Sequence, residues 1–380
     1  MKITDVITTT IHIPLREAFH PAWLPGLETS EFSATILEIE TDEGITGVSA
    51  LQHNPGVIPP GKSSVNIAVE QFLKPLLVGR DPTQTEKLVG NLRGLRKVIS
   101  LPWFVSIALW DIVGKEAGMP IYKLWGGYSD KLRAYASFGE VRTPERRAAD
   151  AKKMLREGFG AIKLRIHTGT VEEDVAQVEA VREEVGDKID IMVDANQAFV
   201  TQGPRWDLKR ALQTARKLEP MNLVWLEEPL PRYNFDDIAT LCKMSGLRIA
   251  GGEDNEGLHE FYWMLEKGAY DVLQPDCTVS EDMFQLRKIA GMAEIRGKWF
   301  APHTWGNGIG LAANLQLAAS VPNCPYFEYP YDPPCLTPDV YYGMLKEPLT
   351  VDSDGMITTP EGPGLGIELN QKAINKFAAE

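Results

Sequence analysis

The pattern of apolar and polar positions changes near residue 130. Residues 1–50 are rich in β-branched side chains, and the turn "TDEG" at 41–44 separates two strand-like runs. Helical spacing of apolar residues follows over 62–77, 82–96 and 102–117. Gly118 and Pro120 come just after the last of these stretches and are typical of a helix end. The first third of the chain is therefore predicted to be a mixed α+β region.

From about residue 131, short apolar runs alternate with helical stretches. "RAYASF" (133–138) is typical of a strand, and the helix predicted after it has Thr143 as N-cap and Pro144 as its first residue. Six further strand–helix pairs follow, and "PYFEYP" (325–330) is a possible eighth strand. Repeated βα units predict a parallel sheet, and this many units favour a closed barrel. An open doubly wound sheet is the alternative, but it would need a GxGxxG motif after its first strand, which the sequence lacks.

Composition and charge limit the classes of partner. The 380 residues are 44% hydrophobic and 24% charged, which is ordinary for a globular chain with one large domain and a smaller one. The net charge of −13 makes nucleic acid and anionic membranes poor partners. The sequence shows no apolar run of membrane-spanning length and no signal peptide, and its four cysteines form no CxxC pair. We therefore expect a cytoplasmic protein with reduced thiols and no membrane contact.

Ionisable residues stand at the end of every predicted strand from the second to the eighth. In a βα barrel these ends converge on one mouth, where active sites lie. In the second strand, "AIKLRIH" (161–167), alternation places three basic side chains on one side. A lone Asp before a helix is ordinarily an N-cap, so the signal lies in the joint pattern. The residues are Lys163, Arg165 and His167, then Asp194 with Asn196, Glu227 with Glu228, Glu253 with Asp254, then Asp276, His303 and Glu328.

Three consecutive predicted strands end in carboxylates, namely Asp194, a glutamate of "WLEEP" (225–229) and Glu253. Like charges this close need a cation. Oxygen-only ligands suit Mg²⁺, whereas Zn²⁺ prefers cysteine and histidine, which lie elsewhere in the sequence. In "WLEEP" the two glutamates are expected to point to opposite sides, one to the barrel mouth and one outward. Spacing alone does not choose between Glu227 and Glu228.

Asp276 and His303 lie at the ends of neighbouring predicted strands. A carboxylate beside an imidazole fixes its tautomer and raises its basicity, which is the arrangement of a general base. A structural salt bridge is the alternative. The polar, glycine-containing loop "APHTWGNG" (301–308) favours the general base.

The ordered set of strand-end motifs resembles the mandelate racemase subgroup of the enolase superfamily, which includes muconate lactonizing enzyme-like proteins. The matching motifs are "KLR" (163–165), "VDAN" (193–196), "WLEEP" (225–229), "AGGED" (250–254), "QPD" (274–276), "APH" (301–303) and "FE" (327–328). The helical stretch 106–127 is also similar to the family's segment before the barrel. The resemblance covers essentially the whole chain.

The resemblance implies an α/β fold, a (β/α)₇β TIM-like barrel with an α+β capping domain. The cap would be made from both ends of the chain, because the C-terminal stretch 347–370 is again β-like with Gly/Pro turns. The expected division is 1–128 for the N-terminal part of the cap, 129–330 for the barrel, and 331–380 for a segment that returns to the cap. A homo-oligomer is also expected from the family.

The resemblance further implies a role for each matching residue. Asp194, Glu227 and Glu253 would hold Mg²⁺, because the family uses the first glutamate of the pair. The metal would bind a small-molecule carboxylate substrate and stabilise the enediolate that forms when the α-proton leaves. Lys163 would neutralise the same carboxylate, Asp276 and His303 would form the base dyad, and Glu328 would hydrogen-bond a carboxylate oxygen.

One position departs from the racemases of the family, which resemble Lys-x-Lys on the second strand. Here the second position is Arg165, and a guanidinium stays protonated at ordinary pH, so it is a poor second base. A one-base reaction fits better: His303 would remove the α-proton and then protonate a departing β-hydroxyl. The expected activity is a hydro-lyase that dehydrates a sugar acid, an aldonate or aldarate, to a 2-keto-3-deoxy acid. A cycloisomerase, an epimerase or racemase, and a non-catalytic member are the alternatives.

Substrate contacts are expected from the cap and from the barrel rim. The stretch "LREAFHPAWLPG" (15–26) is typical of a loop over the mouth and offers His20 and Trp23. His167, Asn196 and Trp305 lie near the strand ends and are further candidates. For any one cap residue, an ordinary surface-loop position is at least as good an interpretation.

Overall fold

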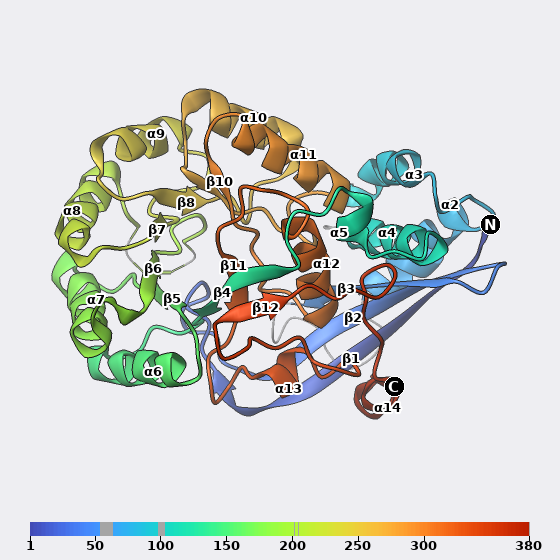
Figure 1. Ribbon diagram of the computed structural model, residues 1–380, viewed down its shortest axis with the longest axis horizontal. Coiled ribbons are helices and arrows are strands. Elements are labelled where there is room, and N and C mark those ends of the chain that lie inside the picture. The colour runs from blue at the N-terminus through green and yellow to red at the C-terminus, as the bar shows by residue number, and fades with distance from the viewer. Residues whose placement is uncertain (54–63, 98–102, 201, 204, 380) are drawn as a thin grey trace.

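The N-terminal part is built on an antiparallel sheet of three long strands, β1 (Ile3–Phe19), β2 (Thr29–Thr41) and β3 (Thr46–His53), as Figure 1 shows. The computed structural model describes residues 1–53, 64–97, 103–200, 202–203 and 205–379. The helices that follow are α1 (Ser64–Ala68), α2 (Lys74–Leu77), α3 (Thr85–Leu92), α4 (Phe104–Glu116) and α5 (Ile121–Leu124). The expected mixed α+β region is therefore present.

Helix α4 packs across β2 and β3 and closes a hydrophobic core between helices and sheet. A Cβ at Gly47 would lie 2.1 Å from the Ala108 carbonyl oxygen, so this close approach requires glycine. The stretch expected to be one helix over 62–77 is α1 and α2 joined by a π-helical turn (Val69–Leu73), and its first two residues lie outside the described part.

Eight parallel strands form a curled sheet in the order β10-β9-β8-β7-β6-β5-β4-β11. The strands are β4 (Lys131–Ser137), β5 (Ala161–Arg165), β6 (Asp190–Asp194), β7 (Leu226–Glu227), β8 (Ile249–Gly251), β9 (Val272–Leu273), β10 (Trp299–Phe300) and β11 (Phe327–Pro330). The helices between them are α6 (Pro144–Arg156), α7 (Val171–Val185), α8 (Leu208–Leu218), α9 (Phe235–Met244), α10 (Gly257–Lys267), α11 (Met283–Glu294) and α12 (Gly308–Ala318). In Figure 1, α6 to α11 surround the strands. The expected (β/α)₇β barrel is confirmed.

The sheet closes between β10 and β11 through side chains. No ladder joins these two strands among the residues that the structure describes. Instead, the Thr304 backbone N–H donates to Glu328 Oε2 at 2.9 Å, and Thr304 Oγ1 donates to the Glu328 carbonyl oxygen at 2.9 Å. The loop after β10 therefore takes the place of a longer strand.

A layer of buried side chains fills the barrel interior. Met192, Trp225 and Tyr326 belong to this layer, and each stands two residues before a strand-end carboxylate. Because side chains two positions apart share a face of a strand, the alternation that buries this layer also points Asp194, Glu227 and Glu328 inward.

Short local motifs fix the helix starts near the strand ends. Thr143 caps α6 by accepting from the Arg146 N–H, and Pro144 is the first helical residue, as predicted. Thr170 and Glu173 form a reciprocal capping box at α7. None of the helices in the described ranges combines the length and apolar character needed to cross a membrane.

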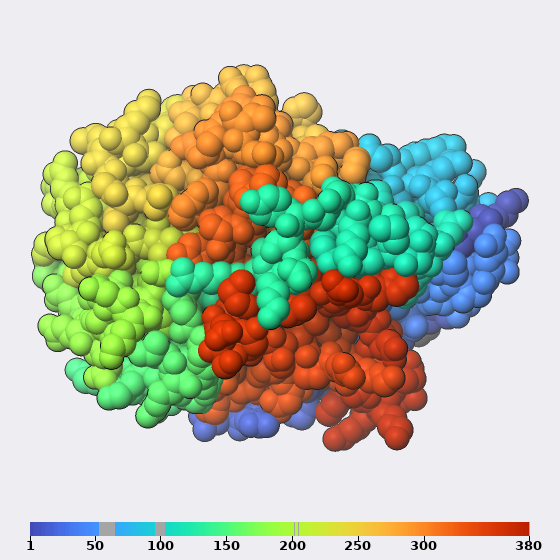
Figure 2. Space-filling view, in the orientation of Figure 1, coloured from blue at the N-terminus to red at the C-terminus, as the bar shows by residue number. Residues whose placement is uncertain are grey.

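The C-terminal segment, red in Figure 2, contacts both parts of the molecule. Its elements are α13 (Pro338–Tyr341), β12 (Met356–Thr358) and α14 (Gln371–Phe377). α13 and α14 pack on β1 of the N-terminal sheet. β12 instead pairs antiparallel with β4 of the barrel, so the segment links the two parts.

Candidate active site at the strand ends

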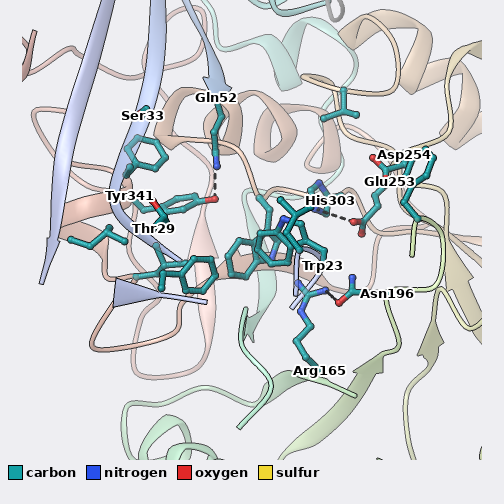
Figure 3. Close-up of a pocket in the computed structure, with 18 of the residues that line it drawn as sticks. Trp23, Thr29, Ser33, Gln52, Arg165, Asn196, Glu253, Asp254, His303 and Tyr341 are labelled. Carbon is teal, nitrogen blue, oxygen red and sulfur yellow. Dashed lines mark hydrogen bonds and ion pairs between the residues drawn. The ribbon is translucent and has the colours of Figure 1, made fainter. Parts of the chain in front are cut away.

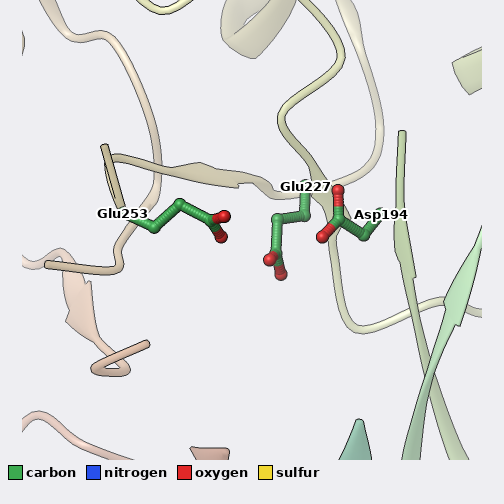
Figure 4. A group of neighbouring side chains, drawn as sticks. All are labelled: Asp194, Glu227 and Glu253. Atoms are coloured by element: carbon green, nitrogen blue, oxygen red, sulfur yellow. The ribbon is translucent and has the colours of Figure 1, made fainter. Parts of the chain in front are cut away.

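Asp194, Glu227 and Glu253 converge at the ends of β6, β7 and β8, as Figure 4 shows. One oxygen of each lies within 4.8 Å of the other two. Parallel register sets Asp194 beside Glu227, because the two are paired residues of neighbouring strands. Glu253 Oε2 is buried without a hydrogen-bond partner, which leaves a ligand atom ready for a cation. The three residues therefore fit an oxygen-liganded ion such as Mg²⁺.

Glu228 differs from the expectation that one glutamate of the pair packs outward. Strand β7 ends at Glu227, and Glu228 adopts a positive φ of 43°, which turns its side chain out of the strand alternation. It lines the cavity, and its Oε1 is buried without a partner. Both glutamates therefore face the mouth, and Glu228 forms a second acidic group with Glu253 and Asp254.

Burial of these acids shifts their ionisation. Desolvation raises the pKa of Glu227 to about 7, against the opposing attraction of Lys163. Desolvation also raises the pKa of Glu253 to about 7, against the attraction of His303. It places the pKa of Glu228 well above its ordinary value, and neighbouring Glu253 and Asp194 add to the shift. Ionised together, these carboxylates need positive charge beside them.

Lys163 supplies part of that charge. Its ammonium is fully buried, contacts Glu227 Oε1, and lies 2.7 Å from Glu328 Oε1 and 3.6 Å from Asp194 Oδ2. Burial alone would disfavour the ammonium, but attraction by Glu227 and Glu328 raises its pKa above the ordinary value. Lys163 is therefore a fixed cation within the carboxylate group.

Arg165 is held from several directions. Its Nη1 contacts Asp194 Oδ2 and donates to Asn196 Oδ1 at 3.2 Å, and its Nε donates to the Phe138 carbonyl oxygen at 2.8 Å. Its guanidinium carbon lies 5.4 Å from the ring centroids of Trp23 and of Trp305. Burial opposes the charge, but Asp194 raises the pKa of Arg165 above its ordinary value.

His303 and Asp276 form a hydrogen-bonded dyad. His303 Nδ1 lies 3.0 Å from Asp276 Oδ2, and His303 Nε2 lies 3.7 Å from Glu253 Oε1. Asp276 Oδ1 accepts from the Thr278 N–H, the Thr278 hydroxyl and the Asn314 amide, so the carboxylate is fixed in place. Burial lowers the pKa of His303, but the attraction of Glu253 and the hydrogen bond to Asp276 outweigh burial and raise the pKa to about 10.

Glu328 is tied to both sides of the site. Its Oε1 accepts from Ser137 Oγ at 2.8 Å as well as from Lys163, and its Oε2 accepts from the Thr304 N–H. Burial would raise the pKa of Glu328, but Lys163 and then His303 lower it to about 2. Ser137 in turn accepts from the Trp305 indole at 2.9 Å, a contact between distant residues that no sequence motif predicts.

A cavity of about 270 Å³ lies between the strand ends and the cap, as Figure 3 shows. Arg165, Asn196, Glu253, His303, Trp23 and Trp305 line it, so five elements far apart in the sequence meet there. Lys163, Asp194, Glu227, Asp276 and Glu328 are buried and are not among its described lining residues.

Two further residues, His20 and His167, were expected to contact substrate. His20 is exposed, and its backbone N–H donates to Glu140 Oε1 at 2.8 Å. His167 lies beyond the end of β5, and burial lowers its pKa. Neither is among the described residues that line the cavity, and their contact with substrate stays a prediction.

The cap contributes lining residues that the sequence analysis did not identify. Thr29, Glu31 and Ser33 of β2, Gln52 of β3 and Tyr341 of α13 all line the cavity. Polar residues at alternate positions of a strand are also the pattern of a solvent-facing surface, so the sequence held no signal that distinguished the two.

Two known domain families together match most of the chain. Residues 6–126 match the family described as "Mandelate racemase / muconate lactonizing enzyme, N-terminal domain". Residues 146–373 match the family described as "Enolase C-terminal domain-like".

Relatives and solved structures match over most or all of the chain. The chain is 33% identical over 393 residues to D-galactarolactone cycloisomerase of Agrobacterium fabrum, and the matched region covers 99% of each protein. It is 31% identical over 364 residues to arabinonate dehydratase of Saccharolobus solfataricus, which covers 93% of each. The structure of L-talarate dehydratase from Polaromonas sp. JS666, complexed with Mg and L-glucarate, superimposes with a TM-score of 0.82 at 28% identity over 100% of this chain and 98% of that one.

Proposed function

This chain belongs to the mandelate racemase/muconate lactonizing enzyme family of the enolase superfamily, and from that premise we propose that it is a Mg²⁺-dependent enzyme that removes the proton α to a carboxylate. The specific reaction we propose is dehydration of a sugar acid, an aldonate or aldarate, to a 2-keto-3-deoxy acid. Full-length similarity to a sugar-acid dehydratase supports this reaction.

Asp194, Glu227 and Glu253 would hold the cation, and the unpartnered Glu253 Oε2 supports that assignment. A divalent cation bound there offsets the negative charge that develops on the substrate carboxylate as the α-proton leaves. Lys163 would add a second positive charge. Glu328, whose two oxygens are held by Ser137, Lys163 and Thr304, would keep the Lys163 ammonium in place beside the substrate carboxylate.

The observation that carries the proposed dehydration is the asymmetry of the cavity. His303 lines it, with Nδ1 hydrogen-bonded to Asp276, so Nε2 is the nitrogen left to exchange protons with substrate. On the β5 side stands Arg165, a guanidinium already bonded to Asp194 and Asn196 and unable to accept a proton. A cation held by Glu253 would offset the attraction that raises the pKa of His303 and would favour the neutral imidazole. One base would then serve both steps: His303 takes the α-proton and returns it to the β-hydroxyl, which leaves as water.

A second candidate reaction uses the same residues. Similarity to a cycloisomerase at 33% identity over 99% of each chain favours elimination of a ring oxygen instead of a hydroxyl. His303 would again remove the α-proton, and the β-carbon would release the oxygen of a lactone ring. The two reactions differ in the leaving group and not in the base.

Mass spectrometry of products separates the two reactions. The Mg²⁺-loaded protein is incubated with aldonic acids, aldaric acids and their lactones. A keto acid one water lighter than a sugar acid indicates dehydration, whereas a keto acid of the same mass as a lactone indicates cycloisomerisation. A keto acid from none of the sugar acids would reject the dehydratase.

His303→Asn tests the base. We expect kcat to fall about a thousandfold, and exchange of the α-proton in D₂O to be lost with it. The matched control is His259→Asn, because His259 is exposed on α10 and is not among the described cavity residues. Exchange that persists in His303→Asn would contradict the one-base mechanism.

A further inference from the structure

The cavity has two chemically different ends. Figure 3 places Arg165, Asn196, Glu253, Asp254 and His303 on one side, and Thr29, Ser33, Gln52 and Tyr341 on the other. The first set belongs to the barrel and the second to the cap and the C-terminal segment. A substrate whose reacting carboxylate lies at the barrel end therefore presents its far end to the cap.

Among the described residues that line the cavity, the positively charged side chains lie at the barrel end. Arg165 and His303 are the basic side chains among the described residues that line the cavity. Both are already engaged, Arg165 by Asp194 and Asn196, and His303 by Asp276. The described part of the cap end therefore offers no cation to a second substrate carboxylate, and an unpaired carboxylate there would lose its hydration without compensation.

Glu31 adds a negative charge at the cap end. It lines the cavity from β2, with 41% of its side chain exposed. His12 Nδ1 lies 3.0 Å from Glu31 Oε1, and the Ser33 hydroxyl donates to the same oxygen at 3.3 Å. The described side-chain contacts of this carboxylate fall on Oε1, so Oε2 remains to accept hydrogen bonds from a ligand.

The neighbours of Glu31 suit hydroxyl groups. Thr29 and Ser33 carry hydroxyls that both donate and accept, and Gln52 has an amide whose oxygen is 3.5 Å from the Tyr341 hydroxyl. A sugar-acid tail donates its hydroxyl protons to Glu31 and exchanges hydrogen bonds with the other side chains. A terminal carboxylate cannot donate to Glu31 and is repelled by it.

We propose that the cavity selects sugar acids with a single carboxylate, the aldonates, and that Glu31 is the residue that rejects a second carboxylate at the far end. This selection rests on the proposed function, because it assumes that a sugar acid reacts at the barrel end. It narrows the substrate class of that site from aldonates and aldarates to aldonates.

Binding measurements test the selection without requiring turnover. Calorimetric titration of the Mg²⁺-loaded protein compares aldonates with the aldarates of the same chain length and configuration. We expect the aldonate of a pair to bind at least about tenfold more tightly, which corresponds to about 1.4 kcal/mol. Equal binding, tighter binding of the aldarate, or binding of neither would overturn the proposal.

Substitution of Glu31 then tests the cause. Glu31→Gln keeps the size of the side chain and removes the charge. The ratio of aldonate affinity to aldarate affinity should therefore fall about tenfold. Glu31→Lys should reverse it. The matched control is Glu40→Gln, the same change at an exposed position farther along β2, which should leave the preference unchanged. An unchanged preference in Glu31→Gln and Glu31→Lys, with unfolding midpoints like that of the parent protein, would overturn the role of Glu31.

The two proposals fail in different ways. If aldonates bind in preference but no sugar acid is dehydrated, the proposed reaction is wrong and the selection by Glu31 stands. If aldarates bind and are dehydrated as well as aldonates, the reaction stands and the selection by Glu31 is wrong.

Discussion

Arg165 has an acidic neighbour and two aromatic ones. Its guanidinium contacts the Asp194 carboxylate and lies near the Trp23 and Trp305 rings, and the residue is 1% exposed. A buried ion pair gains little over a well-packed apolar pair, but loss of one partner leaves an uncompensated charge. Arg165 therefore matters to the fold of the site as well as to its chemistry.

Arg165→Met should destabilise the metal-free protein by about 3 kcal/mol, because it leaves Asp194 without its guanidinium partner. Denaturant unfolding with a chelator measures the loss. Addition of Mg²⁺ should recover part of it, because a cation bound by Asp194 replaces the missing charge. The control is Arg16→Met, which removes an exposed ion pair with Asp339 and should cost at most about 1 kcal/mol. Equal losses in the two variants would contradict the prediction.

At the scale of elements, the parallel strands bring the site together. The sequence alone predicted that the site residues lie at strand ends, because the carboxyl ends of parallel strands meet at one edge. Strand register then sets Asp194 beside Glu227. The position of Glu228 was not readable, because a positive φ overrides strand alternation. The cap contacts of Glu31 and Ser33 were not readable either, because they depend on how β2 sits over the barrel.

The start of α11 offers a prediction on pH dependence. Asp282 is its N-cap and accepts from the Phe284 and Gln285 N–H groups. Burial is the largest cause that raises its pKa from 3.8 to about 6. A carboxyl group whose pKa is raised in the folded state binds its proton more tightly there than in the unfolded state. The free energy of unfolding therefore falls as pH rises from about 4 to about 6, and above pH 6 this effect is constant.

Asp282→Asn removes this ionisation and keeps an oxygen that can cap the helix. As pH rises through this interval, the free energy of unfolding of the variant should therefore increase relative to that of the parent by about 3 kcal/mol. Urea unfolding of both proteins at several pH values provides the measurement. Asp207→Asn, the same change at the exposed N-cap of α8, is the control. A difference at Asp282 that does not vary with pH would contradict the prediction.

At the scale of the whole molecule, the cap meets the barrel around Gly139. The Ala22 N–H donates to the Gly139 carbonyl oxygen at 2.9 Å, and the Phe19 and Trp305 rings stack with centroids 6.1 Å apart. A Cβ on Gly139 would lie 2.5 Å from atoms of both rings. Gly139, in the loop between β4 and α6, therefore sets how closely the cap approaches the barrel.

Gly139→Ala should push Phe19 and Trp305 apart, lower the free energy of unfolding by about 2 kcal/mol, and raise KM for the substrate. Unfolding curves and steady-state kinetics measure the two effects. The control is Gly291→Ala within α11, where an added Cβ meets no atom within 4 Å and should stabilise the helix by about 0.5–1 kcal/mol. If Gly139→Ala left KM unchanged, the cap would not set the shape of the cavity through this contact.

The closure of the sheet at Glu328 has a consequence for how this enzyme can diverge. The Glu328 carboxylate, which is proposed to hold Lys163 in place beside the substrate, also accepts the Thr304 N–H that joins the last strands of the barrel. Selection for activity and selection for folding therefore act on the same carboxylate, and a change there costs both at once. New substrate preferences are expected to arise instead at positions such as Glu31, where the cap can vary while the barrel stays closed.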